Sequence, residues 1–312
     1  MPLCHFFMSR PSFYSRILTK EGQGTPMTEG PLAEKAYGKI NLGLKILGRR
    51  SDGYHDILSI AHCVDLADIL HFEPAPSDQL TCNIEDLSTG PDNLVRRAVD
   101  SYRARLDHPI RNFRIHLEKH IPMRAGLGGG SADAAATLRA LNRFYGEPLD
   151  RTELGEIAAE LGSDIPFLVE GGTALMRGRG EILEPLAWAG AVFYVLAYPE
   201  VEVGTAWAYG QFRPVLTDET PYLKFTSSLS GGCVDHDRLF EVLENDFMPV
   251  VERAYPIVAG LRSQLDRAGA RATSMSGSGS TVYGIFDDRT TASQAQQALQ
   301  EQGYRSFLCR SI

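Results

Sequence analysis

A glycine-rich segment that runs directly into an alanine-rich stretch constrains this chain more than any other feature. The segment reads IPMRAGLGGGSADAAA and occupies residues 121–136. Four of five successive positions in it are glycine: Gly126, Gly128, Gly129 and Gly130. Glycine lets the backbone curl so that successive N–H groups point inward, and it lets a ligand approach closely. The residues that follow, 131–145, predict a helix with Ser131 as its N-cap and Asp133 in its first turn.

A curled glycine loop at a helix N-terminus predicts a site for a polyphosphate. The first N–H groups of a helix have no intrahelical partner, and the helix dipole adds about half a positive charge there. A flexible loop that only caps a helix is the structural alternative, but the Gly-Leu-Gly-Gly-Gly-Ser order beside an alanine-rich helix favours the phosphate site. The predicted nucleotide-binding residues are Pro122, Met123, Arg124, Ala125, Gly126, Leu127, Gly128, Gly129, Gly130, Ser131 and Ala132.

Other well-known nucleotide motifs are absent from the sequence. There is no GxxxxGK[ST] segment, which excludes a P-loop enzyme. Gly126 and Gly128 are not followed by a third glycine at the spacing of a dinucleotide-binding fold. Neither HRD nor DFG occurs, which excludes a protein kinase. The glycine loop therefore belongs to a different class of phosphate site.

The order of predicted elements indicates an α+β chain, a mixed α/β sandwich. Residues 36–47 alternate apolar and polar side chains, as in a half-buried strand. Further strands are predicted over 54–66, 68–73, 80–84, 113–117, 172–176, 191–197, 272–275, 281–286 and 306–309. Helices are predicted over 94–106, 131–145, 151–161, 237–254, 256–268 and 291–302.

Composition and charge exclude several classes of protein. The formal net charge of −8 and the lack of a basic stripe argue against a nucleic-acid-binding protein. Five scattered cysteines without a CxxC pair fit a reducing cytoplasm better than a disulfide framework or a zinc site. No apolar run has the length needed to span a bilayer. We therefore expect a cytoplasmic protein with no nucleic-acid partner and no membrane partner.

Residues 1–30 are treated as a flexible extension and are left out of the fold assignment. The first twenty residues contain several Arg and Ser and no acid, which is typical of an organelle-targeting peptide, as in a plastid protein. The other interpretation is an extension that follows from an early start, since Met8 and Met27 could each begin translation. A cytoplasmic location goes with the second interpretation.

Three further segments carry residue types that suit phosphoryl transfer. YGKINL places Lys39 and Asn41 on one face of the first strand, two residues apart. GSDIPF places Asp164 in a loop predicted to connect a helix to a buried strand. Residues 274–280, SMSGSGS, form a second glycine-serine loop between two strands. Taken singly, Lys39 would be a surface lysine and Asp164 a loop acid, so the inference rests on the whole set.

These four segments, in this order, resemble the GHMP small-molecule kinases, the family of galactokinase, homoserine kinase and mevalonate kinase. The resemblance runs from about residue 36 to about residue 286. It implies two domains, the first like domain 2 of ribosomal protein S5 and the second ferredoxin-like. We assign residues 31–184 to the N-terminal ATP-binding domain and residues 185–312 to the C-terminal domain.

The resemblance also implies the chemistry, which is ATP-dependent phosphorylation of a hydroxyl group on a small molecule. It implies Asp164 as the acid that orients the acceptor hydroxyl and takes its proton, with Lys39 keeping the carboxylate charged. ATP and Mg²⁺ are the implied cofactors, because a polyphosphate donor needs a metal to neutralise it. The metal ligands stay unassigned. Asp133 is either a water-mediated contact to the metal or an acid that stabilises the helix dipole.

Within the family, the closer resemblance is to members whose acceptor carries a cytidine diphosphate group. It rests on KINLGLKILGRRSDGYH, NLV, GSDIPFLVEGG, NDF and both glycine loops, and the DGYH run is the most discriminating part. This resemblance implies that Tyr54 stacks on cytosine and that His55 hydrogen-bonds to its polar edge. The region of Thr205 is implied to supply an opposing aromatic ring, for which we favour Tyr209. Asn41 completes the implied substrate-binding set.

Three alternatives remain beside this hypothesis. One is another GHMP kinase that acts on homoserine, mevalonate or a sugar, against which the DGYH run argues. A second is an inactive nucleotide-binding relative, which would be expected to lose Lys39, Asp164 or glycines of the loop, although all are present. A third is an RNA-binding protein, which the negative charge opposes. A monomer and a homodimer are both compatible with the sequence.

Overall fold

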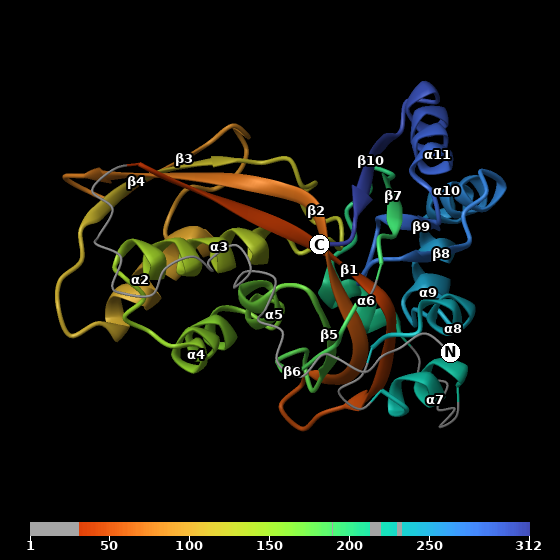
Figure 1. Ribbon diagram of the computed structural model, residues 1–312, viewed down its shortest axis with the longest axis horizontal. Coiled ribbons are helices and arrows are strands. Elements are labelled where there is room, and N and C mark those ends of the chain that lie inside the picture. The colour runs from red at the N-terminus through yellow and green to blue at the C-terminus, as the bar shows by residue number, and fades with distance from the viewer. Residues whose placement is uncertain (1–30, 189, 213–219, 230–232) are drawn as a thin grey trace.

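Two β-sheets lie side by side, and each has helices packed against it (Figure 1). The computed structural model describes residues 31–188, 190–212, 220–229 and 233–312, so the extension 1–30 lies outside the described residues. This arrangement confirms the mixed α/β fold that the sequence predicts. Within the described ranges, no helix combines the length and the apolar character that a membrane crossing requires.

The first sheet has six strands and is organised around the long strand β2. β1 runs antiparallel to β2 along most of its length, and the other edge of β2 is shared by β4 and β5. β3 is parallel to β4, and β6 is antiparallel to β5. The strands are β1 (Leu32–Arg49), β2 (His55–Ala75), β3 (Gln79–Cys82), β4 (Asn112–Glu118), β5 (Thr173–Arg177) and β6 (Ile182–Pro185).

Four helices cover one face of the first sheet, as Figure 1 shows on its left side. They are α2 (Leu94–Arg105), α3 (Gly129–Phe144), α4 (Arg151–Leu161) and α5 (Ile165–Glu170). The central helix α3 has small side chains on its buried side, because many of the buried positions are alanine. Small side chains let α3 approach the sheet closely, and this sets the position of its N-terminus and of the glycine loop before it.

The second sheet has four antiparallel strands in the order β10-β7-β9-β8. Its strands are β7 (Phe193–Tyr198), β8 (Ala272–Met275), β9 (Val282–Phe286) and β10 (Arg305–Arg310). Its helices are α6 (Thr205–Gln211), α7 (Pro221–Ser227), α8 (His236–Glu241), α9 (Met248–Ala254), α10 (Pro256–Arg267) and α11 (Arg289–Glu301). The chain passes from the first sheet to the second between β6 and β7.

Strand β1 is buried on both faces, which differs from the half-buried strand that the sequence predicts. Ala36 packs in the cluster between the first sheet and its helices. Ile40 and Leu42 pack between the two sheets, and Leu44 and Ile46 pack against the helices of the second sheet. Because neighbouring elements cover both faces of its middle part, the polar residues Lys39, Asn41 and Lys45 are buried there, whereas Lys35 and Arg49 towards the ends of β1 are exposed.

Several element predictions are wrong. The segment after Asp164 forms the helix α5, whereas a strand is predicted there. The helix predicted over 237–254 is two helices, α8 and α9, with a break around Asn245. The strands predicted over 54–66 and 68–73 are one continuous strand, β2. Helices α6 and α7 and strand β6 have no counterpart among the predicted elements.

Candidate active site

Lys39 and Asp164 lie next to each other, as the sequence predicts for a catalytic pair. Lys39 Nζ is 3.3 Å from Asp164 Oδ2, and the lysine side chain is only 6% exposed, against 35% for the aspartate. Lys39 Nζ also donates to Asn41 Oδ1 at 2.6 Å. Asn41 Nδ2 in turn donates to Ser59 Oγ at 2.8 Å. Asn41 therefore holds the buried ammonium of Lys39 in place, while the carboxylate of Asp164 stays accessible to a ligand.

The glycine loop meets this pair directly. Lys39 N–H donates to Leu127 O at 3.0 Å, which attaches the loop to β1. A Cβ on Gly128, whose φ is +69°, would lie 3.2 Å from Lys39 Cγ. The loop backbone thus passes against Lys39, and a side chain at Gly128 would displace the lysine side chain.

The start of α3 presents free N–H groups at the same point. The first helical bond that reaches back into the loop runs from Ala132 N–H to Gly128 O, at 2.8 Å. The N–H groups of Gly129, Gly130 and Ser131 precede this bond, so they have no partner within the helix. Together with the dipole of the sixteen-residue helix α3, they form an anion site beside Lys39.

Other residues of the predicted nucleotide loop contribute through the backbone or point elsewhere. Ala125, Leu127 and Ala132 are buried, so their side chains pack in the core. Arg124 extends outward, where its Nη1 lies 2.8 Å from Glu202 Oε2. Met123 is also exposed. The loop therefore offers amide groups to a ligand, rather than a set of charged side chains.

The predicted cap of α3 is wrong, and so is the predicted place of Asp133. The N-cap is Gly128, which makes no side-chain cap hydrogen bond, and the first turn holds no acid. Asp133 is buried one turn later, where its Oδ2 accepts from Lys119 Nζ at 2.7 Å. Neither role that the sequence suggested for Asp133, a metal contact or a dipole-stabilising acid, agrees with this position.

A buried cluster of three charged residues lies directly under the loop. Lys119 Nζ contacts Asp68 Oδ2 at 2.5 Å and Asp133 Oδ2 at 2.7 Å. Asp68 Oδ1 accepts from the N–H groups of His120 and Ile121 as well. A Cβ on Gly129 would lie 3.3 Å from Lys119 Nζ. Lys119 and Asp68 were missed in the sequence, because nothing there indicates that residues 51 positions apart meet.

The ammonium of Lys119 is shared by the carboxyl groups of Asp68 and Asp133. Burial and these neighbouring charges together shift the pKa values of Lys119 and Asp133. Burial acts to lower the pKa of Lys119, but the charges of Asp133 and Asp68 outweigh it and raise the pKa. Burial raises the pKa of Asp133 to about 8, with Lys119 opposing the rise and Asp68 adding to it. Asp133 Oδ1 has no partner among the described residues. We infer that Asp133 is the member of the cluster that carries a proton at neutral pH.

The glycine-serine loop at residues 274–280 is hydrogen-bonded to the glycine loop at residues 126–130. Ser276 Oγ donates to Gly126 O at 2.8 Å and accepts from Asn41 N–H at 3.2 Å. A Cβ on Gly126 would lie only 2.2 Å from Ser276 O, so only glycine fits there. Asn245 Nδ2 donates to the carbonyls of Met275 and Gly277, which fixes the second loop. Both predicted loops therefore belong to one site.

The aromatic residues predicted for the acceptor lie on the segments around this site. The His55 and Tyr209 rings stack on each other, with centroids 4.6 Å apart. Tyr54 is 53% exposed, and Arg179 Cζ lies 4.9 Å from its ring centroid. Burial and the negative charge of Asp164 raise the pKa of Tyr209 to about 12, so the hydroxyl of Tyr209 lies within the influence of Asp164.

Thr205 and His55 are also connected to the site. Thr205 Oγ1 lies 3.1 Å from Ser278 Oγ, which links the start of α6 to the second loop. Burial lowers the pKa of His55, with the charge of Arg49 adding to the effect. His55 therefore favours the neutral form, which can both donate and accept a hydrogen bond.

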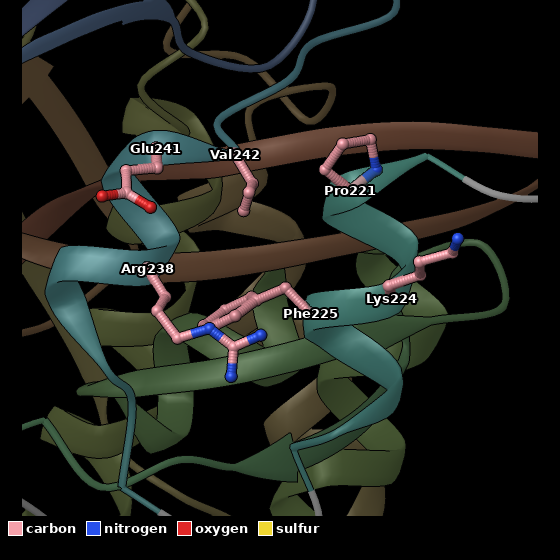
Figure 2. A pocket seen from close by; sticks show the side chains of 6 residues that line it. All are labelled: Pro221, Lys224, Phe225, Arg238, Glu241 and Val242. Carbon is pink, nitrogen blue, oxygen red and sulfur yellow. The ribbon is translucent and has the colours of Figure 1, made fainter.

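Two surface hollows lie away from these residues. One of about 330 Å³ opens between α7 and α8 and is lined by Pro221, Lys224, Phe225, Arg238, Glu241 and Val242, as Figure 2 shows. In it, Arg238 Cζ lies 6.0 Å from the centroid of the Phe225 ring. A second hollow of about 530 Å³ is lined by residues of β1, β2, β5 and α7. Neither lining contains a residue of the candidate active site.

Replacing Gly128 by Val is expected to weaken ATP binding at least tenfold, because a branched side chain cannot adopt the positive φ and would collide with Lys39. Titration with ATP, followed by calorimetry, measures the effect. Gly155→Val is the control, since that glycine has open space around it. Unchanged ATP affinity in Gly128→Val would remove the phosphate-loop assignment.

Comparisons with known proteins agree with this site. The family description "GHMP kinases N terminal domain" matches residues 93–172, and "GHMP kinases C terminal" matches residues 232–305. A 4-diphosphocytidyl-2-C-methyl-D-erythritol kinase of Salinibacter ruber is 39% identical over 284 residues, which are 89% of this chain and 98% of that protein. The protein of the same name from a Synechococcus strain is 42% identical over 277 residues, 86% of this chain and 89% of that protein.

Solved structures show the same similarity. A crystal structure of 4-(cytidine 5'-diphospho)-2C-methyl-D-erythritol kinase superposes with a TM-score of 0.75 at 33% identity, covering 90% of this chain and 100% of that chain. A homoserine kinase from Cytophaga hutchinsonii also has a TM-score of 0.75, at 18% identity, covering 94% of this chain and 97% of that chain. The second match shows the fold alone.

The fold, the two interlocked loops and these similarities define an ATP-dependent small-molecule kinase. GHMP kinases take the phosphoryl group from ATP, which fits an anion site built from backbone N–H groups. The chain belongs to the GHMP kinase family.

Proposed function

We propose that this protein transfers the γ-phosphoryl group of ATP to the 2-hydroxyl of 4-diphosphocytidyl-2-C-methyl-D-erythritol, in non-mevalonate isoprenoid precursor synthesis. The observation that carries the proposal is the contact of Lys39 with Asp164 beside the glycine loop. The substrate is the one for which the similar Salinibacter and Synechococcus proteins are named. The four described cysteines are free, which supports a reducing cytoplasm as its location.

In the proposed reaction Asp164 orients the acceptor hydroxyl and accepts its proton. Lys39 keeps the carboxylate charged and stabilises negative charge on the attacking oxygen. Asn41 fixes the lysine through the 2.6 Å hydrogen bond. The Gly129, Gly130 and Ser131 N–H groups hold the phosphate oxygens, whose charge they stabilise during transfer.

Mg²⁺ is proposed to arrive with the triphosphate. Among the residues that the structure describes, no group of three or more His, Cys, Asp or Glu side chains could hold a metal ion. Asp133 is committed to Lys119 and is buried. Magnesium commonly keeps several waters and binds through substrate phosphates, so a preformed protein cage is not required. We assign no protein ligand to it.

On the acceptor side, Tyr54 is proposed to stack on cytosine and His55 to bond to its polar edge. The exposed ring of Tyr54 is available for such a contact. Tyr209 supports His55 by stacking on it, and we propose that it also borders the base. Thr205, through its contact with Ser278, places the start of α6 against the phosphate loops.

A substrate panel tests the proposal. The purified protein is incubated with ATP, Mg²⁺ and one acceptor at a time: the cytidine diphosphate ester, the same alcohol without the cytidine moiety, homoserine or mevalonate. Phosphorylation of the cytidine diphosphate ester alone is the expected result. Preference for homoserine or mevalonate would favour another GHMP activity, and no turnover with any acceptor would contradict the proposal.

Replacing Tyr54 by Ala is expected to raise the KM for the cytidine-bearing acceptor by about 5- to 150-fold, because a base–aromatic stack contributes roughly 1–3 kcal/mol. The KM for ATP should stay unchanged. Steady-state kinetics with each substrate varied in turn measures both constants. Tyr54→Phe keeps the ring and serves as the control, and an unchanged acceptor KM in Tyr54→Ala would exclude the stack.

A further inference from the structure

The turn between β5 and β6, residues 178–181, contacts both ends of the proposed acceptor site: the segment of Tyr54 and His55, and the segment of Asp164. At one end, Ile57 N–H donates to Gly178 O at 2.7 Å, which holds the turn beside the start of β2, where Tyr54 and His55 lie. At the other end, a Cβ on Gly180 would lie 3.7 Å from Ser163 O, so the turn packs against the segment that carries Asp164. The turn therefore lies between the proposed base contact and the catalytic acid.

Arg179 lies in this turn, and most of the N–H donors of its guanidinium group have no acceptor among the described residues. Its Nε lies 3.5 Å from Glu181 Oε1, and its centre lies over the Tyr54 ring. Within the described part of the chain, neither of its two terminal nitrogens has an acceptor. The side chain is 31% exposed, so a ligand can reach it.

Two other cationic side chains around the site, Arg50 and Lys39, already have carboxylate partners. Arg50 contacts both Asp52 and Asp56, at 2.9 and 3.0 Å. Lys39 is held by Asn41 and Asp164. The carboxylates of Asp52, Asp56 and Asp164 lie among these groups. An anionic acceptor therefore needs a cation at this place to offset repulsion.

We propose that Arg179 binds the diphosphate group of the acceptor and so determines specificity for a nucleoside diphosphate ester. This inference rests on the proposed function. If the base lies on Tyr54 and the reacting alcohol lies at Asp164, the diphosphate that joins them must pass the 178–181 turn. The planar guanidinium can donate two parallel hydrogen bonds to phosphate oxygens, which an ammonium cannot do with the same geometry.

Arg177 provides a matched control in the same hairpin. It ends β5, it is exposed, and it lines the hollow of about 530 Å³ together with residues of α7 such as Leu223. Arg177→Gln therefore removes the same charge from the same hairpin, away from the Tyr54 ring. Comparison with Arg179→Gln separates a local contact from a change in net charge.

The experiment measures binding of CDP and of cytidine to each variant, with saturating ADP present to block the donor site. In the wild type and in Arg177→Gln, CDP is expected to bind more tightly than cytidine. In Arg179→Gln, this preference should fall by about 10- to 30-fold, as for the loss of a partly exposed charge-assisted hydrogen-bond pair, while cytidine affinity changes little. Arg179→Lys should recover part of it.

Two results would overturn the inference. One is an unchanged CDP preference in Arg179→Gln. The other is an equal loss of affinity for CDP and for cytidine, which would mean that Arg179 only supports the Tyr54 ring. The kinase assay is read separately: if the wild type fails to phosphorylate the cytidine diphosphate ester, the proposed function fails, whatever the binding ratio shows.

Discussion

Replacing Asp164 by Asn is expected to lower turnover about 10²- to 10⁴-fold while the KM for ATP changes less than about threefold. Asparagine has nearly the same shape but cannot take the proton of the acceptor hydroxyl. Its amide also removes the negative charge that faces Lys39 Nζ at 3.3 Å. The glycine loop does not depend on this side chain, so ATP binding should persist. Single-turnover measurements of phosphoryl transfer isolate the chemical step.

Glu156→Gln is the matched control for Asp164→Asn. Glu156 lies on α4, shortly before the same segment, and pairs with Arg105 at the surface, where its side chain is 58% exposed. The substitution removes the same charge and should leave turnover unchanged. If Asp164→Asn kept turnover within a few-fold of the wild type, Asp164 would not be the base.

Replacing Lys119 by Met is expected to lower the free energy of unfolding by about 3–5 kcal/mol, because it leaves buried carboxyl groups without their counter-charge. Lys119 is 5% exposed, and Asp68, one of its partners, is fully buried. For a chain of this size the loss corresponds to a fall in Tm of roughly 5–8 °C. Thermal unfolding at neutral pH, followed by circular dichroism, measures it.

Asp133→Asn is the informative partner of that variant. Burial raises the pKa of Asp133, which favours its neutral form, and asparagine is a neutral side chain of nearly the same shape. We expect a cost below about 1 kcal/mol, since the Lys119–Asp68 contact is kept. An equal loss in Lys119→Met and Asp133→Asn would mean that both carboxylates are charged, and no loss in Lys119→Met would contradict a buried ion cluster.

Lys39, Asp164 and both glycine loops could be predicted as parts of one candidate site because each stands in a short segment of characteristic sequence. Lys39 and Asn41 sit two residues apart on one strand, so the period of a β-strand alone places them together. The first glycine loop can be recognised from its high glycine content. Asp164 lies beside Lys39, as predicted, although the element after it is a helix and not a strand. The segment IPFLVE is apolar enough for a buried strand and short enough for either assignment.

The rest of the site depends on contacts that no local pattern contains. Asp68 lies on β2, Lys119 directly follows β4, and their partner Asp133 comes from the helix α3. The stacking of His55 on Tyr209 joins residues more than 150 positions apart in the chain. The N-cap of α3 was misplaced for a different reason: Gly128 adopts a left-handed conformation that starts the helix before Ser131, which is otherwise the better capping residue.

The burial of β1 in all three hydrophobic clusters has a consequence for motion during the reaction. A strand that is shared by the cores of both halves cannot act as a hinge without opening apolar surface to water. Rigid-body closure of one half over the other is therefore costly in this molecule. Lys39 lies on this shared strand, so its position is tied to the cores of both halves.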